Sequence, residues 1–155
     1  MNSKVKLIFI KRTGCPHCAD FAPIFDKLFI LLNNEKKDKG MNLEIKIFDI
    51  NDENEHEDFK KNYSYINNWT NGVPSIFIDC IVDKVIKYDP IQTILPPSDK
   101  MNDNEEINKA AQQIFNNFIY KFKKFTLQLG GNNNLKYKNK YLKYKNKYLL
   151  LKNIY

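Results

Sequence analysis

Apolar residues recur with two different periods along this chain, and each period marks a different kind of element. Residues 5–10 form a short apolar run of strand character, and we expect a strand over residues 4–10. Residues 19–32 carry apolar side chains every three or four positions, which predicts a helix with one core-facing stripe. The stripe ends at Leu32, and residues 33–42 are polar. Pro23 lies inside this helix and is expected to kink it, because proline lacks an N–H and crowds the preceding turn.

The same two periods and the proline positions place the remaining elements. We expect a strand over residues 43–50, a polar turn over 51–55, a helix over 57–66, a strand over 75–79, its hairpin partner over 81–88, a loop over 89–103 and a helix over 104–125. The order β–α–β–α–β–β–α predicts an α/β fold in which a mixed sheet is flanked by helices.

The charge divides the chain into two unequal parts. Residues 1–134 carry 18 Lys and Arg against 18 Asp and Glu, so the net charge of +7 comes entirely from residues 135–155. We therefore expect a folded domain over residues 1–126, a flexible linker over 127–134 that contains Gly130 and Gly131, and a basic tail.

The basic tail repeats every seven residues. Its apolar and aromatic members recur at alternating spacings of four and three, which predicts a helix with one stripe: Tyr137, Tyr141, Tyr144, Tyr148, Leu151 and Tyr155. Lysines flank this stripe without any acid, so two copies would repel each other. An acidic partner, an anionic surface or nucleic acid fits the tail better, and a solvated helix that only aids solubility is the alternative.

Targeting signals are not evident in the sequence. The first apolar run has only six residues and opens a strand pattern, so we expect no signal peptide. No stretch approaches the ~18 apolar residues of a membrane span. We therefore expect a cytoplasmic protein, or a component of a virion assembled in the same reducing environment, where two closely spaced cysteines are catalytic or metal-binding.

The most informative motif is Cys15-Pro16-His17-Cys18, at the junction between the first strand and the first helix. Cys15 is expected just ahead of the helix, where free N–H groups and the positive end of the dipole favour a thiolate. In such sites the thiol pKa falls to roughly 3.5–7.5. We expect Cys15 to be the nucleophile, Cys18 the resolving thiol and His17 the residue that tunes the thiolate.

The alternatives to redox chemistry at these two cysteines are a buried structural pair or half of a zinc site. A tetrahedral zinc site needs four ligands, and the remaining candidates are Cys80, His17 and His56, so we expect no metal. Cys80 follows the third strand and is expected to be a small packed residue, with a regulatory or intermolecular thiol as the alternative. His56 is expected in a solvated turn.

Over residues 4–125 the chain resembles the thioredoxin fold and its oxidoreductases. The resemblance rests on the Cys-Pro-His-Cys motif, on Ala22-Pro23-Ile24 and on Gly72-Val73-Pro74-Ser75. It implies that Pro74 is preceded by a cis peptide bond and that the backbone of Val73 binds an extended substrate. It implies no cofactor, since the dithiol itself carries two electrons.

The sequence also departs from that family. Gly14 stands where thioredoxins usually carry Trp, and Phe9 stands where they carry a buried acid. The Pro-His pair resembles strongly oxidising periplasmic DsbA-type proteins, while Cys-Pro-x-Cys is also similar to glutaredoxins. By the latter resemblance, Lys11 and Arg12 are candidates for binding a glutathione carboxylate, with solvated surface charge as the alternative.

The sequence therefore predicts a thiol–disulfide oxidoreductase that acts on protein thiols and disulfides and is more oxidising than a standard thioredoxin. Two alternatives remain: a redox-inactive scaffold localised by its basic tail, and a glutathione-dependent, glutaredoxin-like enzyme. The Lys/Tyr/Asn-rich tail resembles those on proteins of giant DNA viruses, which implies a viral protein but no mechanism.

Overall fold

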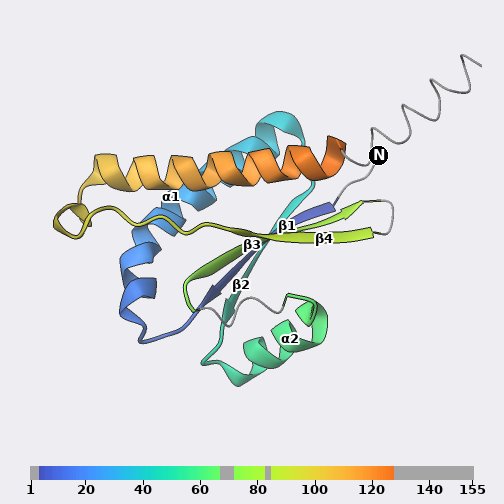
Figure 1. Ribbon diagram of the computed structural model, residues 1–155, viewed down its shortest axis with the longest axis horizontal. Helices are drawn as coiled ribbons and strands as arrows, with labels where there is room; N and C mark the ends of the chain where they lie inside the picture. The colour runs from blue at the N-terminus through green and yellow to red at the C-terminus, as the bar shows by residue number, and fades with distance from the viewer. Residues whose placement is uncertain (1–3, 67–71, 83–84, 128–155) are drawn as a thin grey trace, which may run out of the picture.

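Strands and helices follow one another in the expected order in the computed structural model, which describes residues 4–66, 72–82 and 85–127 (Figure 1). The elements are β1 (Lys4–Lys11), α1 (Pro16–Lys39), β2 (Leu43–Asp49), α2 (Glu53–Tyr63), β3 (Ser75–Val82), β4 (Val85–Ile91), the short 3-10 helix η2 (Ser98–Lys100) and a last helix over residues 104–127. The expected α/β class is confirmed. The basic tail and all but the first residue of the expected linker lie outside the described residues.

The described strands form one mixed sheet in the order β2-β1-β3-β4. β1 and β2 are parallel, and Lys11 is opposite Asp49 at their carboxyl ends. β3 runs antiparallel to both β1 and β4. Figure 1 shows α1 and the last helix on one face of this sheet and α2 on the other.

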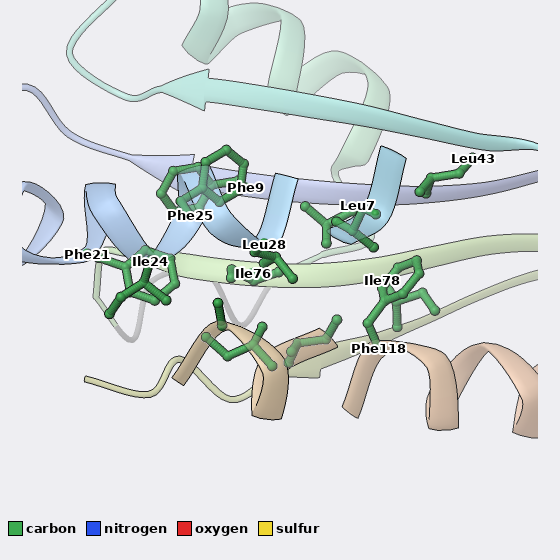
Figure 2. Close-up of a cluster of buried hydrophobic side chains, with 14 of the residues drawn as sticks. Leu7, Phe9, Phe21, Ile24, Phe25, Leu28, Leu43, Ile76, Ile78 and Phe118 are labelled. Carbon is green, nitrogen blue, oxygen red and sulfur yellow. The ribbon is translucent and has the colours of Figure 1, made fainter. Parts of the chain in front are cut away.

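Two apolar clusters hold the helices on the sheet because successive side chains of a strand point to opposite faces. Alternate residues of β1, namely Val5, Leu7 and Phe9, pack with α1 and the last helix (Figure 2). Ile8 and Ile10 pack with α2 on the opposite face.

Phe9 belongs to the larger of these clusters. Its ring stacks on that of Phe25 with 4.2 Å between ring centroids, and its side chain is buried. At this position the resemblance to thioredoxins implies an acid, and the structure fills it with an aromatic pair instead.

The first helix is longer than its apolar stripe. α1 continues through the polar residues that follow Leu32 and ends where Gly40 adopts the left-handed conformation, with φ +61°. The Lys39–Glu35 ion pair, four residues apart, adds support to this exposed last turn. The early and late parts of α1 run in different directions in Figure 1, as the position of Pro23 within the helix leads one to expect.

The expected bounds of α2 were wrong. The helix begins at Glu53 rather than at residue 57 and ends at Tyr63 rather than at 66. Asp52 caps it by accepting a hydrogen bond from the Glu55 N–H at 3.0 Å, so the helix starts inside the segment expected to be a turn.

The bounds of the hairpin were also wrong. Cys80 lies within β3 rather than after it, and Ile81 belongs to β3 rather than to the next strand. β4 extends into the expected loop and includes Pro90. Because β4 is an edge strand among the described residues, it tolerates a proline without an N–H.

Candidate active site

Cys15 is presented by a tight turn between β1 and α1. The Cys15 N–H donates to the carbonyl of Arg12 at 3.1 Å, and Gly14 between them has φ +81°. A residue with a side chain is strained at that φ, which explains why Gly14, and not the Trp of thioredoxins, precedes the cysteine here. Cys15 is the N-cap residue of α1, and its carbonyl accepts the N–H groups of Cys18 and Ala19, each at 3.1 Å.

The two thiols of the motif have opposite electrostatic surroundings. The backbone N–H of Cys18 has the largest effect on Cys15 and lowers its pKa, and the Cys18 thiol, the backbone N–H of His17 and the Arg12 guanidinium act in the same direction, against burial. For Cys18, burial is the largest effect, and it raises the pKa of that thiol. Cys15 therefore ionises first, and both cysteines are free thiols in this structure.

A second loop faces Cys15 from the start of β3. The Cys15 Sγ lies 3.8 Å from the carbonyl oxygen of Val73, and the Val73–Pro74 peptide bond is cis, as the family resemblance implied. The Ser75 hydroxyl donates to the carbonyl of Gly72 and closes this loop on itself. The structure thus brings together the Cys-Pro-His-Cys motif and the proline loop, although some sixty residues of sequence separate them.

A groove runs along the proline loop beside the motif. It has a volume of about 440 Å³ and is lined by His17, Gly72, Val73, Pro74, Ser75, Thr93 and Leu95. Sequence analysis missed Thr93 and Leu95, which lie in the segment after β4. No local signal could have identified them, because periodicity does not describe the path of an irregular loop.

The position of His17 bears on its expected role in tuning the Cys15 thiolate. Its side chain is exposed and borders the groove, and its contribution to Cys15 comes from its backbone N–H. Tuning of the thiolate by the imidazole stays a prediction.

A second groove lies on the other side of the cysteine turn. Its lining residues, with a volume of about 440 Å³, are Lys11, Arg12, Thr13, Gly14, Cys15, Pro16, Cys18, Ala19 and Ala22. Lys11 and Arg12, the candidates for binding glutathione, thus border the same space as Cys15. Arg12 is exposed, and Lys11 is half-buried.

The remaining cysteine and histidine lie in other parts of the fold. Cys80 is fully buried in the larger apolar cluster, and burial raises its pKa to about 11. The expectation of a solvated turn for His56 was wrong: this residue is half-buried on α2, because the helix begins at Glu53. Among the described residues, no group of three or more His, Cys, Asp and Glu side chains is arranged to hold a metal ion.

Comparison with known proteins does not assign the chain to a family. No protein-family model matches the chain, and no curated protein matches it. Within residues 4–66, 72–82 and 85–127, no helix is long and apolar enough to cross a membrane.

Proposed function

We propose that this protein is a thiol–disulfide oxidoreductase with a thioredoxin-like domain, in which Cys15 is the nucleophile and Cys18 the resolving thiol. The observation that carries the proposal is the placement of Cys15 at the N-cap of α1, with its sulfur 3.8 Å from the Val73 carbonyl of the proline loop. The pKa directions of the two thiols, lowered for Cys15 and raised for Cys18, support it. A nucleophile must ionise near neutral pH, while its partner stays protonated until the second step. The sheet order β2-β1-β3-β4, with the Cys-Pro-His-Cys motif at the start of α1, is compatible with that fold.

The reaction is a pair of thiol–disulfide exchanges. The Cys15 thiolate attacks one sulfur of a substrate disulfide, an S–S bond forms to Cys15 as the substrate bond breaks, and the departing sulfur takes a proton. Cys18 then loses its proton to solvent and attacks the Cys15 Sγ, which releases the second substrate thiol. Two electrons pass to the substrate, and the protein is left with a Cys15–Cys18 disulfide. The reverse sequence oxidises a substrate dithiol.

The stabilised Cys15 thiolate favours the reverse direction. Interactions that stabilise the thiolate stabilise the reduced protein, and they make its disulfide a better oxidant. We therefore propose a potential more oxidising than that of a standard thioredoxin, with His17 contributing through its backbone N–H.

The groove along the proline loop supports a polypeptide substrate. The half-buried Val73 places its carbonyl beside Cys15, and an N–H of an extended chain could donate to that carbonyl. Leu95, with 38% of its surface exposed, also lines this groove and offers an apolar contact.

Exchange with a disulfide-bonded peptide tests the proposal. Cys15→Ser is expected to abolish exchange, and Cys18→Ser to accumulate a mixed disulfide that intact mass detects as protein plus peptide. Cys80→Ala is the matched control, because that thiol is buried away from the site, and it is expected to retain exchange. Undiminished exchange by Cys15→Ser would refute Cys15 as the nucleophile, and no exchange by the wild type would favour a redox-inactive scaffold.

A second candidate is a glutathione-dependent enzyme. The groove that Lys11 and Arg12 share with Cys15 favours it, because a thiol substrate bearing carboxylates could place them against these cations. Activity that requires glutathione and falls in Arg12→Gln would support this candidate over a polypeptide substrate.

The other parts of the proposal concern the chain outside the site. We propose that residues 1–126 form the redox domain and that the basic tail localises it to an acidic partner, an anionic surface or nucleic acid, in the cytoplasm or in a virion. Removal of residues 135–155 is then expected to leave disulfide exchange intact.

A further inference from the structure

The turn that carries Cys15 is hydrogen-bonded to Asp49, an acid at the end of β2. The Asp49 carboxylate accepts the Thr13 N–H at 3.1 Å through Oδ1, and it accepts the Thr13 hydroxyl through Oδ2. The Asn51 N–H donates to the same Oδ1 at 3.0 Å. Three donors thus converge on one carboxylate that is only 9% exposed.

The two residues after Asp49 also donate hydrogen bonds to the cysteine turn and the residue before it. The Asn51 side-chain amide donates to the Thr13 carbonyl at 2.8 Å, and the Ile50 N–H donates to the Lys11 carbonyl at 3.0 Å. Both the N–H and the C=O of Thr13 are therefore fixed by the segment that leads from β2 to α2. A single surface turn without such partners would be free to move.

The position of Asp49 is itself determined by the fold. The parallel pairing of β1 and β2 sets Asp49 opposite Lys11, the residue at which the cysteine turn begins. The Asp49 N–H donates to the Glu55 carboxylate at 2.6 Å, which connects the same residue to α2. Burial is the largest single effect on Asp49 and acts to raise its pKa, but the hydrogen bonds from Thr13 and Asn51 together outweigh it, so the pKa is lowered and the carboxylate is ionised at neutral pH.

We propose that Asp49 is a positioning residue for Cys15: by holding Thr13, it fixes the turn so that the cysteine sulfur meets the first N–H groups of α1. This inference rests on the proposed function, since it concerns the same nucleophile. Thr13 lies two residues before Cys15, and the Arg12 carbonyl that accepts the Cys15 N–H belongs to the residue next to it. A shift of Thr13 therefore moves both the N-cap residue and the Arg12 guanidinium.

A positioning role and a purely electrostatic role of Asp49 predict opposite shifts of the Cys15 pKa. A carboxylate near a thiol disfavours the thiolate, so loss of the Asp49 charge alone would lower the Cys15 pKa. Loss of the hydrogen bonds to Thr13 would raise it, because the N–H groups of His17 and Cys18 and the Arg12 cation would no longer be aimed at the sulfur. The groups that act on the sulfur most strongly are Cys18, His17 and Arg12, and Asp49 is not among them.

The test is the pH profile of Cys15 alkylation by iodoacetamide in the reduced full-length chain, with the labelled cysteine identified by peptide mass. Asp49→Ala is expected to raise the midpoint by about one pH unit, which is about a tenfold loss of thiolate well below the midpoint. Asp49→Asn is expected to stay at or below the wild-type midpoint, because the amide oxygen can accept the two N–H groups while its NH2 donates to the Thr13 hydroxyl. Asp103→Ala is the matched control: it removes a carboxylate that also accepts two backbone N–H groups, at the start of the last helix.

Failure of the proposed function and failure of the positioning role of Asp49 give different results in this experiment. A wild-type midpoint near that of an ordinary thiol would overturn the proposed function itself. A lowered wild-type midpoint that is unchanged or further lowered by Asp49→Ala would overturn the positioning role alone, as would an equal shift in Asp103→Ala. If Asp49→Ala does not fold, Thr13→Val decides: it removes one donor to the carboxylate and is expected to raise the midpoint by a smaller amount, and no shift would overturn the inference.

Discussion

A buried ion pair in the sheet offers the sharpest test of how the fold is stabilised. Lys6 and Asp79 are directly opposite each other on the antiparallel strands β1 and β3. The Asp79 side chain is fully buried, that of Lys6 is 16% exposed, and 3.5 Å separates Lys6 Nζ from Asp79 Oδ2. The ammonium also donates to the Tyr63 hydroxyl at 3.2 Å and lies 4.8 Å from the centre of its ring. We predict that Lys6→Met destabilises the fold strongly.

The magnitude follows from what the substitution leaves behind. Removal of one partner of a buried pair costs about 3–5 kcal/mol, because the other charge stays buried without compensation. Lys6 is partly exposed, so we expect the lower end, about 3 kcal/mol. For a chain of this size, each kcal/mol lowers Tm by about 2–4 °C, which gives a drop of about 6–12 °C. Replacing both members, as Lys6→Met with Asp79→Leu, is expected to recover most of the loss, because well-packed apolar residues remove the need for compensation.

Urea unfolding followed by circular dichroism measures these differences. Lys4→Met is the matched control on the same strand: the Lys4–Glu44 pair, at 2.9 Å, has side chains 50% and 33% exposed, so we expect less than about 1 kcal/mol. Equal losses of stability in Lys6→Met and Lys4→Met would refute the expectation that burial makes the Lys6–Asp79 pair the more costly one to break.

Three further outcomes are expected. Phe118→Ala removes a fully buried ring from the larger cluster and is expected to lower the free energy of unfolding by about 3–5 kcal/mol in the same urea assay. Gly40→Ala forces a side chain into the left-handed conformation that ends α1, and a loss of about 1–2 kcal/mol by thermal unfolding is expected. Native Cys80 is expected to resist iodoacetamide between pH 6 and about 9 and to react only after unfolding, because it is buried and burial raises its pKa to about 11; labelling read by peptide mass checks this.

The sequence predicted well what depends on local periodicity. The order of the elements and the apolar stripe of α1 follow from spacings within one segment, and the structure confirms both. The cis bond before Pro74 also agreed with expectation, because the residues around it resembled a known loop. The contact between that loop and Cys15 was implied by the same resemblance and not by the spacing of residues.

Element ends were predicted less well, for two different physical reasons. The last two turns of α1 are exposed, so no apolar stripe marks them, and the helix ends instead where Gly40 allows a left-handed residue. The start of α2 did carry a signal: Asp52 and Glu55 have the spacing typical of a helix N-terminus, and Asp52 caps the helix. Reading that spacing as a turn was the error.

The buried acids could not be predicted from local pattern. Asp79 occupies a position on β3 that faces α2, and its partner Lys6 comes from β1 through tertiary pairing. Asp49 contacts Thr13 across 36 residues of sequence. In both cases the sequence shows only an isolated acid at or near the end of an apolar run, and a solvated strand end explains that equally well.

The reduction potential of the Cys15/Cys18 pair tests the central claim most directly. Equilibration of the full chain in glutathione buffers, followed by acid quenching and mass analysis, counts reduced and oxidised protein. The account predicts a two-electron couple that disappears in Cys18→Ser, with a potential of about −120 to −200 mV, more oxidising than the about −270 mV of thioredoxin. A chain that forms no Cys15–Cys18 disulfide at any glutathione ratio would contradict the account.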